Sequence, residues 1–288
     1  MADPTILIAS DFTPGSAAAS LGADRAVPRI RRRQFGPADP AAVRIAVGIG
    51  SALVVAEAVT LTLGPTAGVL AHAIALVALA ALSMRLPRGA NQRLTLSAGL
   101  IPIVRILSIA VPAAIIPPIY WYLEIGLAGL EGILLLMRRL DLAPRDVGLR
   151  RTPLAEVVSV GVIGAILGIP AYLIAGRLEL GYGAGPVALV IASAVVMIFV
   201  GFFEELLFRG LIQSAGTQLF SRGGVLISVA ATALMYSASL NPRYVVFATF
   251  VAAFFGVVAR RSGSIAAPVA GHAALALVQL VVLPIVVS

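Results

Sequence analysis

Apolar segments of about twenty residues recur along this chain, and short loops separate them. Segments of this kind lie at 43–63, 66–84, 95–112, 116–137, 154–176, 186–220, 223–241, 243–260 and 264–286. A helix needs about 20 apolar residues to cross the roughly 30 Å hydrocarbon core of a bilayer. The runs are continuous, whereas a transmembrane β-barrel requires short alternating segments. The sequence therefore predicts an all-α, polytopic transmembrane helix bundle of about eight to nine spans.

The composition supports this fold class and excludes several functions. Hydrophobic residues make up 60% of the 288 residues and charged residues 12%, whereas soluble domains carry about 25% charged residues. The chain has no cysteine, which excludes disulfides, a thiol nucleophile and thiolate metal sites. The formal net charge is +8, but the basic residues are all arginines, mostly at predicted helix ends. We therefore expect membrane lipids as partners and no nucleic acid.

The distribution of arginines predicts how the spans are oriented. The loops near 64–65, 113–117 and 241–243 carry almost no charge except Arg243, while the alternate loops are rich in arginine. The positive-inside rule then places the N-terminus and the arginine-rich loops in the cytoplasm. The lysine-free composition, rich in alanine, glycine, arginine and proline, is typical of a GC-rich bacterial genome. We expect an integral protein of a bacterial plasma membrane.

Composition also predicts four regions along the chain. Residues 1–40 are polar, small and proline-containing, so we expect a flexible cytoplasmic tail. N-terminal transmembrane helices follow over 41–137. The segment 138–153 is polar and is expected to lie at the membrane interface. The last region, 154–288, is predicted to form the transmembrane core that carries the functional residues.

Three charged residues lie inside one apolar run. They are Glu204, Glu205 and Arg209, and each costs roughly 2.5–3.5 kcal/mol at the centre of a membrane helix. Glu205 and Arg209 are four residues apart, so they share a helix face and can pair. Glu204 points about 100° away and is expected to face a cavity. A purely structural salt bridge beside a protonated glutamate is the alternative at this stage.

His272 lies in the last predicted span. Equal path lengths from the intervening turns allow Glu204, Ser239 and His272 to meet inside the bundle, and we expect them nearer the cytoplasmic face. A glutamate and a histidine in a shielded pocket suit peptide hydrolysis, with the glutamate accepting a proton from water. A hydrogen-bonded structural histidine and a proton relay of a transporter are the alternatives.

The Glu204-Glu205-Leu-Leu-Phe-Arg209 segment resembles the Glu-Glu-x-x-x-Arg signature of the CAAX protease and bacteriocin-processing (CPBP, or Abi) family of intramembrane proteases. The Asp146–Arg150 segment and the Gly263–Pro268 segment before His272 are also similar to that family. The resemblance covers about residues 138–286. It implies a helix bundle with an intramembrane conical cavity that opens to the cytoplasm.

The resemblance also implies roles for individual residues. Glu204 would be the general base, Glu205 would assist it and pair with Arg209, and His272 would bind a divalent metal such as zinc or stabilise an oxyanion. The implied substrates are prenylated CAAX proteins or, in bacteria, peptides and membrane-embedded segments.

The chain departs from the family pattern at two positions. Ser239 stands where the family has a histidine, and Ala276 stands where it has asparagine or aspartate. Asn241 and Gln279 lie close enough in sequence to substitute in part. Two functions therefore stay open: an intramembrane endopeptidase with Glu204 as base, and a catalytically inactive relative that acts as a membrane scaffold or binding protein.

Four further polar residues in the N-terminal spans are predicted to be structural. We expect His72 to be a structural histidine and Glu57 to be hydrogen-bonded to a neighbouring helix. Arg105 and Glu124 lie at similar depth on either side of a predicted turn, which predicts an ion pair between them.

Overall fold

The computed structural model describes residues 39–111, 115–178, 180 and 185–287. Its described residues form helices joined by short connections and contain no strand. The predicted tail lies outside the described residues except for Asp39 and Pro40. The all-α class is therefore confirmed.

Eight helices of the described part are long and apolar enough to cross a membrane. They span Pro40–Leu63 (α1), Pro65–Arg85 (α2), Ala90–Ala110 (α3, Ala90–Ala98, with α4, Leu100–Ala110), Pro118–Arg139 (α5), Leu154–Ala175 (α6), Pro186–Phe220, Pro242–Ser262 (α11) and Ala266–Val286. A shorter apolar helix, Gly223–Tyr236 (α10), continues as a 3-10 turn to Ser239. The prediction of a polytopic bundle with eight to nine spans is thus confirmed, and the chain is an integral membrane protein.

Proline and glycine mark where these helices begin and end. Proline occupies the first turn of α1, α2, α5, α7 and α11, where its missing N–H costs no helical hydrogen bond. Gly64 has a φ of +89° and separates α1 from α2, a conformation that glycine adopts without steric cost. Asn241 accepts a hydrogen bond from the backbone of Tyr244 and so caps α11.

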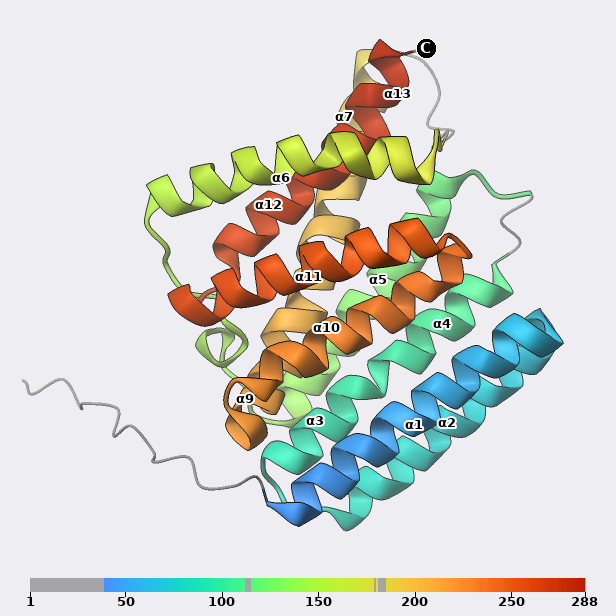
Figure 1. Ribbon diagram of the computed structural model, residues 1–288, viewed down its shortest axis with the longest axis vertical. Coiled ribbons are helices and arrows are strands. Elements are labelled where there is room, and N and C mark those ends of the chain that lie inside the picture. The colour runs from blue at the N-terminus through green and yellow to red at the C-terminus, as the bar shows by residue number, and fades with distance from the viewer. Residues whose placement is uncertain (1–38, 112–114, 179, 181–184, 288) are drawn as a thin grey trace, which may run out of the picture. The chain divides into compact units, whose positions relative to one another are not determined.

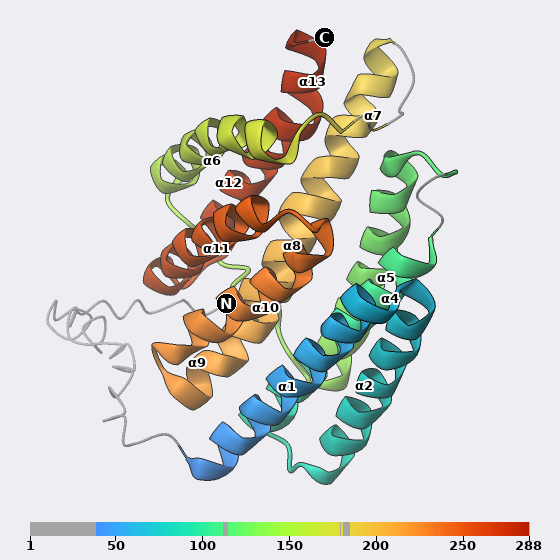
Figure 2. The same cartoon turned by 45° about the vertical axis from the view of Figure 1, so that its right-hand side comes forward.

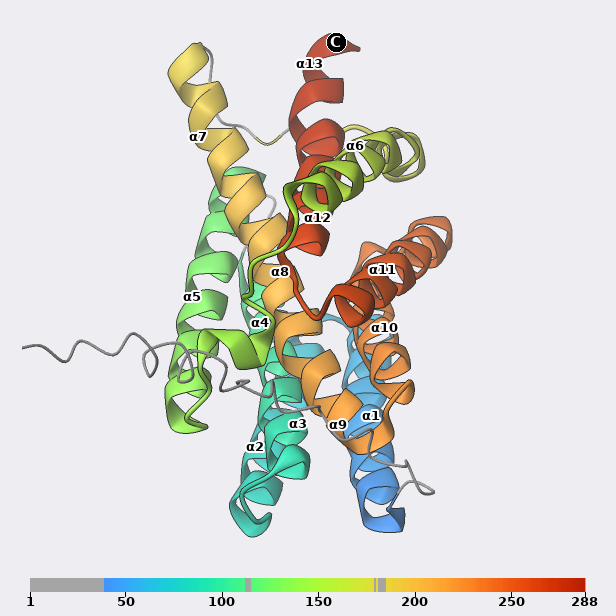
Figure 3. The ribbon, with the colours of Figure 1, turned by 90° about the vertical axis from the view of Figure 1, so that its left-hand side faces the viewer.

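The segment Pro186–Phe220 is one continuous helix with two π-helical stretches. It consists of α7 (Pro186–Val196), the π-helical Met197–Phe202, α8 (Phe203–Glu205), the π-helical Leu206–Gln213 and α9 (Ser214–Phe220). It passes between α5 on one side and α11 and α12 (Ala266–Leu277) on the other (Figure 3). The three charged residues predicted to be functional lie in and between the π-helical stretches, which frequently occur at functional sites.

The other helices pack around this central helix in two groups. On one side α1 and α2 lie together against α3 and α4 (Figure 2). On the other side α6 and α12 pack against each other, and α10 packs against α11 (Figure 1). Large apolar side chains such as Ile74, Leu127 and Val190 remain exposed on the outer faces of the helices. This outward apolar surface is what a hydrocarbon solvent requires.

Glycines allow α12 to approach its neighbours closely. A Cβ atom at Gly164 of α6 would collide with the backbone of Gly271, and one at Gly201 would lie 2.6 Å from the Cα of Ala273. Small residues at such crossings let helix backbones come together inside a membrane. Because Gly271 and Ala273 flank His272, these two contacts determine where its imidazole lies.

The segment predicted to be interfacial also contacts the start of α12. Its 3-10 turn, Pro144–Val147, buries Val147 completely. The carbonyl of Gly148 accepts a hydrogen bond from the backbone of Ile265, and Ser264 donates its hydroxyl to the carbonyl of Arg150. These contacts hold the beginning of α12 against the turn.

Candidate functional site

Glu205 and Arg209 form a buried ion pair. Nη1 of Arg209 lies 3.1 Å from Oε1 of Glu205, and the two side chains are 1% and 0% exposed. Arg209 also donates from Nη2 to the carbonyl of Ala252 on α11, at 3.0 Å. The pair predicted from the spacing of four residues is therefore present, and it joins the central helix to α11.

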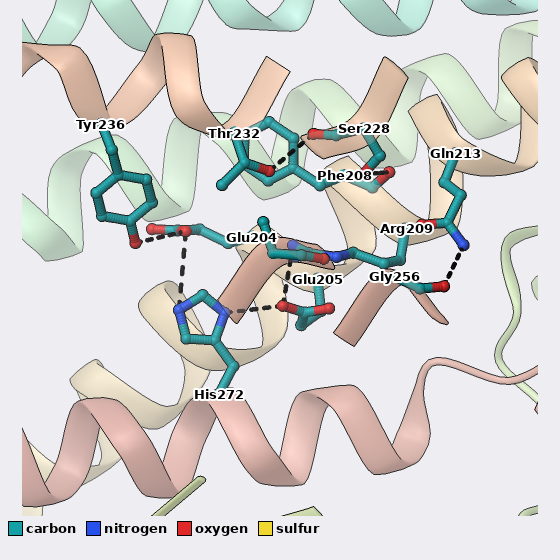
Figure 4. A network of polar contacts seen from close by, with 11 residues as sticks. Glu204, Glu205, Phe208, Arg209, Gln213, Ser228, Thr232, Tyr236, Gly256 and His272 are labelled. Atoms are coloured by element: carbon teal, nitrogen blue, oxygen red, sulfur yellow. Dashed lines mark hydrogen bonds and ion pairs between the residues drawn. The ribbon is translucent and has the colours of Figure 1, made fainter. Parts of the chain in front are cut away.

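His272 lies between the two glutamates (Figure 4). Its Nδ1 is 2.8 Å from Oε1 of Glu205, and its Nε2 is 3.9 Å from Oε2 of Glu204. In its ion pair with Arg209, Glu205 is a carboxylate, and a carboxylate only accepts hydrogen bonds. Nδ1 therefore carries a proton that it donates to Glu205. The imidazole also stacks on Phe255 at 5.8 Å between ring centroids, which restricts its orientation.

Glu204 has a partner that the sequence did not predict. The hydroxyl of Tyr236, near the end of α10, donates to Oε2 of Glu204 at 2.9 Å (Figure 4). A signal was available, because Tyr236 lies three residues before Ser239, the position that departs from the family pattern, and a phenol in an apolar helix needs a partner.

A cavity of about 730 Å³ lies beside these residues. Glu204, Tyr236 and His272 contribute to its wall, together with further polar groups of Tyr244 and Gln279. Four aromatic side chains are also part of the wall, namely Trp121, Tyr122, Phe199 and Phe203. The predicted intramembrane cavity is thus present, and the side chain of Glu204 reaches it.

Ser239 and Ala276, the positions that depart from the family pattern, take no part in the polar cluster formed by Glu204, Glu205, Arg209, Tyr236 and His272. Ser239 lines the cavity but lies exposed in the 3-10 turn after α10, where its Oγ accepts a hydrogen bond from the backbone of Asn241. Glu204, Ser239 and His272 therefore share one cavity, yet it is Tyr236 that contacts Glu204. Ala276 is buried in the cavity wall and contributes no polar side chain.

The two predicted auxiliary residues also bond elsewhere. Asn241 caps α11 and donates from Nδ2 to the carbonyl of Ile174. Gln279 exchanges hydrogen bonds with the hydroxyl of Tyr244, at 3.1 and 3.2 Å. Both line the cavity, but in the described part of the chain their hydrogen bonds do not go to Glu204.

A second buried charged cluster lies among the N-terminal helices, and it corrects one prediction. Arg105 donates from Nε and Nη2 to the two carboxylate oxygens of Glu57, each at 2.9 Å. Its predicted partner, Glu124, lies exposed on α5. The prediction was wrong because similar depth in the membrane does not determine which helix face meets Arg105. Nε2 of His72 lies 3.3 Å from the same glutamate, in the structural position expected of it.

The residues around His272 do not fit a zinc ion. Within the described ranges no group of three histidine, cysteine or acidic side chains is placed to hold a metal. Nδ1 of His272 and Oε1 of Glu205 are already bonded to each other, which leaves Nε2 and Glu204 as donors. Catalytic zinc sites use three protein ligands. The two donors left at His272 and Glu204 are therefore fewer than a catalytic zinc ion needs.

Comparison with known protein families finds a match in the part of the chain that contains these residues. Residues 186–278 match the family model described as Rce1-like, type II CAAX prenyl endopeptidase. This segment is similar to the Rce1-like family. It contains Glu204, Glu205, Arg209, Tyr236 and His272, so the resemblance to the CAAX protease family is confirmed where the polar cluster lies. No curated protein and no solved structure shows a significant match to the chain.

Proposed function

We propose that this protein is an intramembrane endopeptidase in which Glu204 activates a water molecule for attack on a peptide bond. The observation that carries the proposal is the pair of polar atoms at the cavity wall, Oε2 of Glu204 and Nε2 of His272, 3.9 Å apart. This separation is too long for a direct hydrogen bond and short enough for one water to contact both atoms.

The buried ion pair prepares His272 for this role. Glu205, neutralised by Arg209, holds the imidazole through Nδ1 and so directs Nε2 towards Glu204. A supporting contact that fixes the tautomer and orientation of a histidine is a recurrent feature of catalytic sites. In this proposal Glu205 and Arg209 are positioning residues, and Glu204 and His272 contact the reacting groups.

Proton transfers complete the reaction. Glu204 accepts a proton from the water as the water oxygen bonds to the peptide carbonyl carbon. The hydroxyl of Tyr236 lies close enough to Glu204 to donate a hydrogen bond to the negative charge that develops on the carbonyl oxygen. Nε2 of His272, which carries no proton in this tautomer, accepts a hydrogen bond from the attacking water. Glu204 then gives its proton to the leaving nitrogen as the carbon–nitrogen bond breaks.

A non-catalytic binding role is the second candidate, and one observation favours it. Ala276 lies in the cavity wall where the family has a side chain able to form hydrogen bonds. Removing one donor from an oxyanion site costs about 10²–10³ in rate. A scaffold that uses the same cavity to hold a peptide would not need that donor.

Proteolysis of a panel of lipidated and membrane-anchored peptides by the purified protein in liposomes separates the two functions. Glu204→Gln removes the base but keeps the size and the hydrogen bond from Tyr236, and Glu124→Gln on the exposed face of α5 is the matched control. Cleavage by the wild type and the control, with a loss of about 10²–10⁴ in Glu204→Gln, supports the peptidase. Absence of cleavage in all three folded proteins supports the binding role.

A further inference from the structure

The cavity lies towards one set of helix ends. Its walls include Pro65 at the start of α2, Ile109 at the end of α4, Ala175 at the end of α6 and Ser239 after α10. Leu240, also in the wall, is 76% exposed. The cavity therefore opens where these helices end, and not at the opposite ends of the same helices.

Charge distinguishes the two sets of helix ends. At the cavity end, the described loops and helix termini carry Arg177 and Arg243. The opposite ends carry the other arginines of the described residues that lie outside the buried clusters: Arg44, Arg85, Arg88, Arg93, Arg138, Arg139, Arg145, Arg150, Arg151, Arg222, Arg260 and Arg261. An excess of arginine in short loops identifies the cytoplasmic side of a membrane protein. The cavity lies at the other side.

We propose that the cavity opens to the extracytoplasmic side of the membrane and receives its peptide from there. This orientation differs from the expectation that the resemblance implied, a cavity open to the cytoplasm. The physical reason is the direction of the chain. The helix ends at Leu63, Ala110, Ala175 and Ser239, near the cavity mouth, all follow a span that begins at an arginine-rich end.

The size and lining of the cavity indicate which peptides it takes. The cavity has about 730 Å³, a size within the roughly 300–1,000 Å³ of pockets that hold small ligands. A short extended peptide segment is an occupant of this size. The aromatic wall formed by Trp121, Phe199 and Phe203 suits apolar side chains. The substrate class is an extended apolar segment of a secreted or membrane-anchored peptide at the extracytoplasmic surface, and its cleavage rests on the proposed function.

The absence of cysteine from the whole sequence makes the orientation directly measurable. Ser239→Cys places one thiol at the exposed cavity mouth, and Ser221→Cys places one between α9 and α10 at the opposite end. Intact cells that carry either variant in the plasma membrane are treated with a membrane-impermeant maleimide, before and after permeabilisation. Leu240→Cys and Arg222→Cys repeat the comparison at exposed neighbours, so the test does not depend on one variant of each end.

We expect Ser239→Cys to be labelled in intact cells and Ser221→Cys only after permeabilisation. The reverse pattern would overturn the proposed orientation. Labelling requires no proteolysis, so it is independent of the proposed activity. A peptide added outside intact cells and cleaved by the wild type but not by Glu204→Gln would support the substrate side. If Ser239→Cys is labelled in intact cells but no peptide is cleaved, the proposed orientation is supported and the proposed peptidase activity is contradicted.

Discussion

Nδ1 of His272 lies 2.8 Å from Oε1 of Glu205, although 67 residues separate them in the sequence. The same oxygen is 3.1 Å from the guanidinium of Arg209. One buried carboxylate thus neutralises a cation and orients an imidazole at the same time. Glu204, the adjacent residue on the helix, faces the cavity and is left for chemistry.

Replacing Tyr236 by phenylalanine removes the hydroxyl that contacts Glu204 and keeps the ring. We expect kcat to fall by about 10² with little change in KM, because a donor that acts on the reacting groups contributes mainly to the transition state. Tyr120→Phe is the control, since that tyrosine is 57% exposed on the outer face of α5. Equal kcat values for the two variants and the wild type would remove Tyr236 from the mechanism.

Replacing Arg209 by methionine leaves Glu205 with one polar partner fewer in a fully buried position. The free energy of unfolding, measured by denaturant titration in detergent, should fall by about 3–5 kcal/mol. The double variant Glu205→Gln with Arg209→Met should lose less than the sum of the single variants, because no buried charge is then unpaired. Simple additivity would show that the two side chains do not stabilise each other.

The ion pair between Arg105 and Glu57 gives a second stability prediction. Arg105→Met should lower the free energy of unfolding by about 3–5 kcal/mol, because it leaves the carboxylate of Glu57 buried among helices α1, α2 and α4. Glu124→Gln should change it by less than about 0.5 kcal/mol, since that residue is exposed. A large effect of Glu124→Gln would restore the pairing that the sequence predicted.

Two glycines of α6 provide a matched test of how His272 is positioned. A Cβ at Gly164 collides with the carbonyl of Gly271, whereas at Gly161 the nearest atoms, in Ala270, lie at 4.0 Å. Gly164→Ala should destabilise the protein by about 1–3 kcal/mol and lower kcat, because α12 must move. Gly161→Ala should be neutral or slightly stabilising. Equal thermal unfolding midpoints and kcat values would refute this account of the helix crossing.

Chelation tests whether the activity is independent of a bound zinc ion. Treatment of the purified protein with EDTA, followed by gel filtration, should leave kcat unchanged. Among the described histidine and acidic side chains beside His272, Nε2 of His272 and Glu204 are the ligands left for a metal, fewer than a catalytic zinc needs. The same treatment of a known zinc peptidase is the positive control. Loss of activity that zinc restores would contradict the prediction.

Several features follow from the sequence alone because they depend on local geometry or on solvent. The apolar runs predict spanning helices, since hydrocarbon leaves no partner for an unpaired backbone group. The spacing of Glu205 and Arg209 places them on one helix face before any tertiary contact forms. The family signature also directs attention to Glu204 and His272, which the structure brings to one cavity.

Contacts between helices were decided only by the tertiary structure. Glu57 and Glu124 both lay within the depth range of Arg105, and the packing of α2 against both α1 and α4 brings Arg105 to Glu57. The motif position pointed to Ser239, but α10 ends in a 3-10 turn that places Ser239 at the mouth and leaves Tyr236 to reach Glu204. Helix rotation and crossing depend on close packing of many side chains and glycines at once. A linear pattern specifies depth along a helix, whereas only packing specifies which face meets which neighbour.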